Sequence, residues 1–345
     1  MSHRNTLAAL AAIASLGAFT STASAQIKVV ATTSTYASLA EEIGGEHVTV
    51  FTIASPDQDV HFVRPKPSFA PKLAEADLLL TTGMDLELWL PALIDKAGNA
   101  KISEGQVGYV AVAEGVTKLE IPAVADRSAG GVHIYGNPHI LTSPLNVRKV
   151  AENITIGLVK VDPQHRAFYE QRLAAFRHKM DVSLFGEPLL DVIGAPTLIR
   201  LAERGRLVSF LENKQIKGRP MLELLGGWMK KALPLHGRKL VTYHKNWIYF
   251  ARLFGLEVVG EVEPKPAIPP TPKHVEKIIN LMRTLDVRVV LAANYFDESK
   301  VRRICKAVDA EAVIVPLYVG GAAGAADYFA LVDHWLDRLL AAYGR

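Results

Sequence analysis

The chain has 345 residues, of which 49% are hydrophobic, and it carries a net charge of +4 with a single cysteine. A charge this small, without a basic stripe interleaved with aromatic residues, argues against a nucleic-acid-binding protein. The one cysteine, Cys305, excludes an internal disulfide, so hydrophobic cores must hold the chain, which is long enough for two lobes of ordinary domain size. Cys305 lies at an apolar position of a helical pattern, which predicts a buried, inert thiol.

Residues 1–25 have the layout of a secretory signal peptide. A short basic start is followed by an apolar stretch from Leu7 to Phe19 and by the small residues Ala23-Ser24-Ala25. The apolar stretch is too short and too rich in alanine to span a bilayer. We therefore expect cleavage before Gln26 and a soluble mature protein in the periplasm.

Residues 26–145 alternate between strand and helix patterns and predict an N-terminal α/β lobe. Strands are expected at 27–31, 47–53, 77–82 and 107–112, and helices at 35–43, 68–76 and 86–97. Strands separated by helices imply a mainly parallel sheet with helices on its faces.

Residues 146–180 have a helical period that is interrupted once, at Asp162-Pro163. Asp162 is expected to cap a helix and Pro163 to occupy its first turn. The segment therefore predicts two helices, or one long broken helix, that link the lobes.

Residues 181–345 predict a C-terminal α/β lobe, although its first part is the least regular segment of the chain. A helix is expected at 196–210, inside what we interpret as an inserted segment near 181–225. The alternation then resumes, with strands at 239–243, 257–262, 287–292 and 312–316 and helices at 246–254, 274–285, 300–308 and 328–343. The fold class is therefore α/β, with two lobes that each contain a mainly parallel sheet flanked by helices.

Three of the eleven histidines stand where a predicted strand ends or a loop begins: His61 in DQDVHF, His139 in YGNPHI and His244 in VTYHKN. Ligands bind at the carboxyl ends of parallel strands because the loops there converge on one crevice. A single histidine is more often a surface or hydrogen-bonded core residue. Three imidazoles that converge from both lobes, however, would make a metal site that suits zinc better than manganese or magnesium.

These histidines also carry a resemblance to the ABC-transporter solute-binding proteins for zinc or manganese, the cluster A-I family. The segments VVATTSTYASLAEEIGG, DQDVHFVRPKPSFAPKLAEADLLLTTGMDLELWL, GNPHI, VTYHKNWIYFARLFGLEVVG and EVEPKPAIPPTPKHVEKI resemble that family's motifs in order. The resemblance implies that His61, His139 and His244 are metal ligands. It also implies that a long rigid helix joins the two lobes and that the metal lies between them.

The fourth ligand is not evident. The family often supplies a late carboxylate, but the matching positions appear here as Ala293 and Val315. Four side chains and a water molecule remain as candidates for the fourth ligand; the side chains are His133, Asp297, Glu298 and Asp327. Asp59, two residues before His61, is expected to orient that imidazole or to cap a loop.

The sequence thus predicts a high-affinity periplasmic receptor that binds Zn²⁺, or less readily Mn²⁺, and delivers it to an ABC importer. It would act as a monomer, without catalysis, and its partner would be a permease in the inner membrane. The alternatives are a zinc-dependent hydrolase, or a metal-binding adhesin or periplasmic metal chaperone on the same fold. The hydrolase lacks an HExxH motif and a clearly placed general base.

Overall fold

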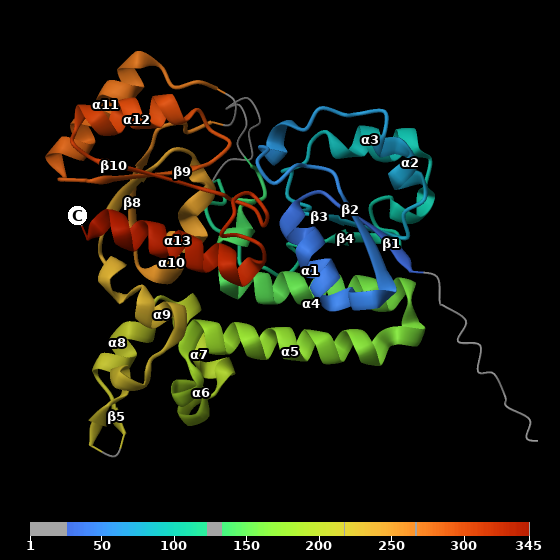
Figure 1. The fold of residues 1–345 in the computed structure, drawn as a ribbon, viewed down its shortest axis with the longest axis horizontal. Coiled ribbons are helices and arrows are strands. Elements are labelled where there is room, and N and C mark those ends of the chain that lie inside the picture. The colour runs from blue at the N-terminus through green and yellow to red at the C-terminus, as the bar shows by residue number, and fades with distance from the viewer. Residues whose placement is uncertain (1–25, 123–132, 217, 266–267, 345) are drawn as a thin grey trace, which may run out of the picture.

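The computed structural model describes residues 26–122, 133–216, 218–265 and 268–344. The predicted signal peptide therefore lies outside the described residues. Two α/β lobes stand side by side over a pair of long helices, and a smaller helical segment extends away from the C-terminal lobe (Figure 1). Within the described ranges, no helix has both the length and the apolar character needed to cross a bilayer.

The N-terminal lobe is built on a four-stranded parallel sheet. Its strands are β1 (Ile27–Ala31), β2 (Val48–Thr52), β3 (Leu78–Thr81) and β4 (Tyr109–Ala111), in the order β2-β1-β3-β4. Helices cover both faces, so β3 is buried along its whole length and reads as a continuous apolar run. The helices are α1 (Ser34–Gly44), α2 (Phe69–Ala74), α3 (Leu90–Ala97) and α4 (Pro144–Val161).

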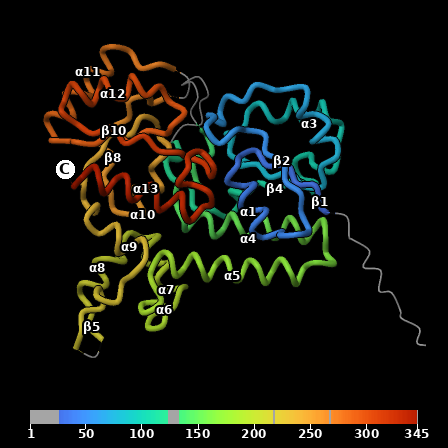
Figure 2. The backbone as a smooth tube through the Cα atoms, in the orientation of Figure 1, coloured from blue at the N-terminus to red at the C-terminus, as the bar shows by residue number. Residues whose placement is uncertain are grey.

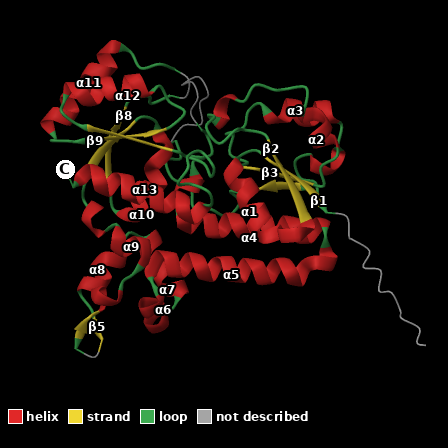
Figure 3. Cartoon of the chain, in the orientation of Figure 1, coloured by secondary structure: helices red, strands yellow, loops and turns green. Residues whose placement is uncertain are grey.

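The C-terminal lobe repeats this arrangement. Its strands are β7 (Lys239–Thr242), β8 (Glu257–Glu261), β9 (Val289–Ala293) and β10 (Glu311–Val315), in the order β10-β9-β7-β8. Its helices are α10 (Ile248–Phe254), α11 (Pro272–Thr284), α12 (Glu298–Ala307) and α13 (Tyr328–Tyr343). In each lobe the first strand lies between the second and the third, so the order in which strands are added to the sheet reverses at the first strand (Figure 3). Ligand crevices form at such switch points.

Two antiparallel helices connect the lobes. Helix α4 packs on α1 and the N-terminal sheet, and α5 (Arg166–Phe185) returns beside it and reaches α9 (Gly227–Lys231) below the C-terminal lobe (Figure 2). The chain turns between them at Asp162, which occupies the predicted N-cap position before Pro163; its carboxylate makes no capping bond and accepts hydrogen bonds from the Tyr169 hydroxyl and from His165. Helix α5 thus contacts α1 of the N-terminal lobe and α9 below the C-terminal lobe.

The segment between α5 and α9 contains α6 (Glu187–Ile193), α7 (Ala195–Glu203), α8 (Leu207–Glu212) and the short strands β5 (Gln215–Ile216) and β6 (Arg219–Pro220). The prediction of one helix over 196–210 is wrong, because Gly205 takes a left-handed conformation with φ +64° and ends the helix there. Helix α3 likewise starts at Leu90, later than the predicted start at Leu86. Cys305 is buried in α12, and burial raises the pKa of its thiol to about 11.

An ion pair fixes α4 against α5. Arg148 Nε lies 2.7 Å from Asp181 Oδ1, and the guanidinium also donates to Oδ2 at 3.0 Å. The two side chains are only 19% and 9% exposed. Burial raises the pKa of Asp181 despite the opposing effect of Arg148, so the carboxylate depends on its partner.

We predict that Arg148→Met lowers the free energy of unfolding by about 3 kcal/mol, because it leaves a buried carboxylate unpaired. Arg166→Met, which removes the exposed pair with Glu170 on α5, should cost less than about 1 kcal/mol. Urea denaturation of both variants measures the difference. Equal losses would show that the buried pair does not fix the helix hairpin.

Candidate metal centre

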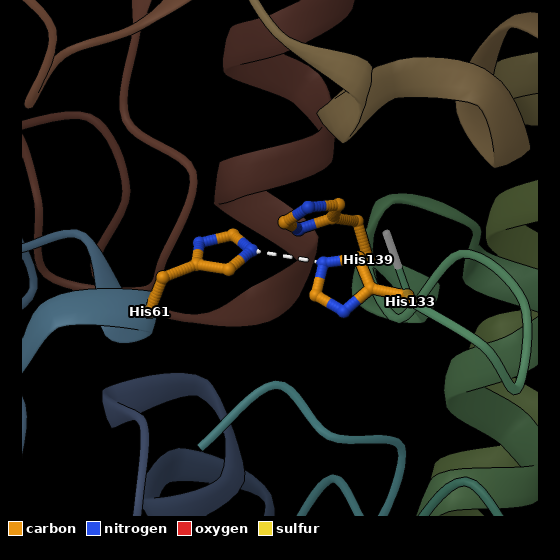
Figure 4. A group of neighbouring side chains, drawn as sticks. All are labelled: His61, His133 and His139. Atoms are coloured by element: carbon orange, nitrogen blue, oxygen red, sulfur yellow. Dashed lines mark hydrogen bonds between the residues drawn. The ribbon is translucent and has the colours of Figure 1, made fainter. Parts of the chain in front are cut away.

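Four histidines from three separate segments meet between the lobes. His61 lies in the short turn Val60–Phe62 that follows β2, and His244 directly follows β7. His133 and His139 belong to the loop that leads into α4. Figure 4 shows His61 approaching from one side and His133 and His139 from the other, with their rings converging.

The rings are close enough to share one ion. The Nε2 atoms of His61 and His133 are 3.2 Å apart. Ligand atoms of these two residues and of His139 all lie within 4.8 Å of one another. His244 is not part of this group with metal-ligand spacing, but its ring centroid lies 5.7 Å from those of both His61 and His139. The structure therefore brings together the three predicted histidines and His133.

Three of these rings are hydrogen-bonded to groups outside the histidine cluster. His61 Nδ1 donates to Asp59 Oδ1 at 2.6 Å, and His244 Nδ1 donates to the carbonyl oxygen of Glu263 at 2.8 Å. The His133 ring is hydrogen-bonded to the backbone of Asp85. In His61 and His244 this leaves Nε2 as the free nitrogen that faces the other rings. Asp59 thus lies where an orienting carboxylate was predicted, and it also caps the turn through the His61 amide at 3.0 Å.

The loop that carries His139 is hydrogen-bonded to the C-terminal lobe. Asn137 accepts a hydrogen bond from the His139 amide through Oδ1, and its Nδ2 donates to the carbonyl of Lys245 and to Glu120. Tyr249 on α10 donates to the carbonyl of Asn137 at 2.7 Å. Because Lys245 and Tyr249 follow His244 in the chain, these contacts set the positions of His139 and His244 relative to each other.

Burial lowers the pKa of three of the imidazoles. It lowers the pKa of His133 to about 3 and that of His244 to about 4, with further contributions from the neighbouring histidines. Burial, followed by the charges of His61, His244 and His133, also lowers the pKa of His139 well below 6.5. Burial alone would raise the pKa of Asp59, but its hydrogen bond and charge interaction with His61 outweigh burial and lower it. The neutral form that burial favours in His133, His139 and His244 is the form that binds a cation.

The carboxylates considered as fourth ligands have other partners. Asp297 caps α12 by accepting from the Ser299 amide, and Asp327 caps α13 by accepting from the Ala330 amide. Glu298 pairs with Arg302 along α12. Within the described ranges, none of these three belongs to a cluster with metal-ligand spacing, whereas His133 does.

The arrangement fits zinc. A tetrahedral zinc ion bound at about 2.0–2.1 Å places neighbouring nitrogens about 3.3 Å apart, close to the spacing of His61 and His133. His139 is 4% exposed and its Nε2 has no hydrogen-bond partner. A buried polar atom without a partner is costly, and a metal would satisfy it.

Asn246 belongs to the centre but was not predicted. It is fully buried, and its Nδ2 lies 3.3 Å from His139 Nδ1. Its position two residues after His244, in a loop that follows a central strand, was the only available signal.

Comparison with known proteins places the chain in a family. The family model described as "Zinc-uptake complex component A periplasmic" matches residues 29–183 and 221–342. The iron-binding protein YfeA of Yersinia pestis is 24% identical over 324 residues, which cover 93% of this chain and 87% of YfeA. The manganese ABC transporter substrate-binding lipoprotein PsaA of Streptococcus anginosus is 32% identical over 50% of this chain, which spans only 54% of PsaA.

Solved structures share the fold. A crystal structure of ZnuA superposes with a TM-score of 0.67 at 22% identity, over 92% of this chain and 99% of that one. The Mn-bound periplasmic metal binding protein of Candidatus Liberibacter asiaticus gives a TM-score of 0.64 at 17% identity, over 92% and 98%. Both agree with the predicted α/β class. Since the family model covers most of the chain, this protein belongs to the zinc-uptake complex component A periplasmic family.

Proposed function

We propose that the protein is a periplasmic receptor that binds one Zn²⁺ between its lobes and delivers it to an ABC importer. His61, His133, His139 and His244 would be the ligands. The observation that carries the proposal is the meeting of these four imidazoles, with the Nε2 of buried His139 unpartnered. Substrate-binding proteins of ABC transporters are not enzymes, so the family sets the hydrolase alternative aside.

The donor set favours zinc over manganese. Imidazole nitrogen suits zinc, whereas carboxylate and carbonyl oxygen suit manganese and magnesium. Asp59, a carboxylate beside the rings, already accepts from His61. Because relatives carry names that refer to iron and manganese, the identity of the metal requires a direct test.

The four histidines differ in burial and in the loops that carry them, and this difference suggests the order in which they bind the metal. His139 and His244 lie on loops joined through Asn137 and Lys245 and are 4% and 3% exposed. His61 and His133 are more exposed and lie on different segments. We propose that His139 and His244 form a rigid initial binding site for the metal and that His61 and His133 then complete its coordination. A membrane permease would then recognise the loaded form through both lobes.

Replacement of a ligand should abolish tight binding. We predict that His139→Ala lowers zinc affinity at least about 100-fold, beyond the loss typical of residues that only support a ligand. His133→Ala should also weaken binding, which tests the fourth ligand. His178→Ala, which alters a histidine on α5 with a 70% exposed side chain, is the matched control. Calorimetry with a competing chelator measures the affinities, and wild-type affinity in His139→Ala would overturn the proposed site.

Selectivity gives a second test. Metal-free protein dialysed against equal concentrations of Zn²⁺ and Mn²⁺ should retain zinc in more than about tenfold excess, because nitrogen ligands follow the order of affinity in which zinc exceeds manganese. Elemental analysis of the recovered protein gives the ratio. Predominant occupancy by manganese would refute the choice of zinc and leave the metal-binding role intact.

The stability of the metal-free protein should fall in acid. The pKa of His244 is about 4 in the fold against 6.5 when unperturbed, so the unfolded chain binds the proton first as the pH drops below 6.5. His244 alone should then cost about 2 kcal/mol of stability between pH 7 and pH 5. Urea titrations at both pH values test this, with His244→Gln as the control. An equal loss in that variant would assign the effect to other groups.

A further inference from the structure

The outward nitrogen of His139 faces an unusual partner. The outward nitrogens of His61 and His244 face acceptors, a carboxylate and a carbonyl oxygen respectively. His139 Nδ1 instead faces the amide nitrogen of Asn246 at 3.3 Å. An amide N–H donor requires an acceptor, so in this arrangement Nδ1 carries the lone pair and the ring proton lies on Nε2.

That protonation blocks the nitrogen which faces the other rings. His139 Nε2 is buried without a partner, and so is Asn246 Oδ1. Rotation of the amide by about half a turn exchanges its oxygen and nitrogen with little change in shape. Oδ1 would then accept from Nδ1–H, and the lone pair of Nε2 would point into the cluster.

One neighbour of the amide suits the rotated arrangement. The same Asn246 Nδ2 lies 3.1 Å from the hydroxyl of Tyr295, a group that donates as readily as it accepts. After rotation this hydroxyl can donate to Oδ1. The Thr142 hydroxyl lies 3.0 Å from the His139 carbonyl oxygen and 3.1 Å from the Asn246 carbonyl oxygen, so it links the backbones of the two residues.

We propose that Asn246 is a positioning residue that sets the tautomer of His139. The amide oxygen of Asn246 accepts from Nδ1–H of His139, and this leaves the lone pair of Nε2 free to bind the metal. This inference rests on the proposed function, because it requires His139 to be a ligand.

Two substitutions at Asn246 test it, with a third elsewhere as the control. Asn246→Leu removes both the donor and the acceptor, whereas Asn246→Asp keeps only acceptors in nearly the same shape. Asn153→Leu alters another buried asparagine, which donates to the carbonyls of Val112 and Glu114 away from the rings. Zinc affinity, the visible spectrum of the Co²⁺-loaded protein and ¹H–¹⁵N correlations of the His139 ring are the three readouts.

We expect Asn246→Leu to lower zinc affinity about 10–100-fold and to shift the Co²⁺ bands, as for residues that orient a ligand. Asn246→Asp should retain affinity within about tenfold of wild type, and it should hold the proton of His139 on Nδ1 even without metal. Asn153→Leu should bind zinc and Co²⁺ as wild type does. Asn246→Ala replaces the leucine variant if the latter does not fold.

The outcomes separate the two proposals. Wild-type affinity and spectrum in Asn246→Leu would overturn the positioning role while the zinc receptor stands. Equal weakening in the leucine and aspartate variants would overturn the acceptor role of Asn246. A ring proton on Nε2 of His139 in the wild-type protein would overturn the proposed tautomer. Failure of the wild-type protein to bind zinc would overturn both proposals.

Discussion

The structure depends on one constraint: the polar groups buried between the lobes must be hydrogen-bonded. Asn137 contributes to this hydrogen bonding, because it joins the loop of His139 to Glu120, to the backbone carbonyl of Lys245 and to the Tyr249 hydroxyl. The ion pair between Arg148 and Asp181 adds a second fixed point, at the helix hairpin. Together these contacts fix the position of the lobes relative to each other. Without them the histidine rings, which come from distant parts of the chain, would not meet.

The same burial governs the electrostatics of the centre. Taking imidazoles out of water favours their neutral form, and several rings placed together disfavour a charge on any one of them. The depressed pKa values of His133 and His244 follow from this. The cost of grouping buried histidines in the metal-free protein is thus linked to their readiness to bind a cation at neutral pH.

We propose that selectivity for zinc arises from the groups that surround the rings. Aspartates and glutamates that could have supplied oxygen ligands are engaged in capping helices or in surface pairs, as with Asp297, Asp327 and Glu298. Asp59 acts through His61, and we propose that Asn246 acts through His139. The outer groups therefore orient nitrogen donors and do not compete with them.

The sequence by itself determined the α/β class, the family resemblance and most of the strands, because buried parallel strands leave continuous apolar runs and helices leave a periodic pattern. It also indicated His61, His139 and His244, since polar residues at strand ends stand out against those runs. Only the tertiary structure decided that His133, and not Asp297, Glu298 or Asp327, lies with them. It alone revealed the partnership of Asn246 with His139. Both depend on irregular loops brought together from distant parts of the chain, and local periodicity carries no information about such contacts.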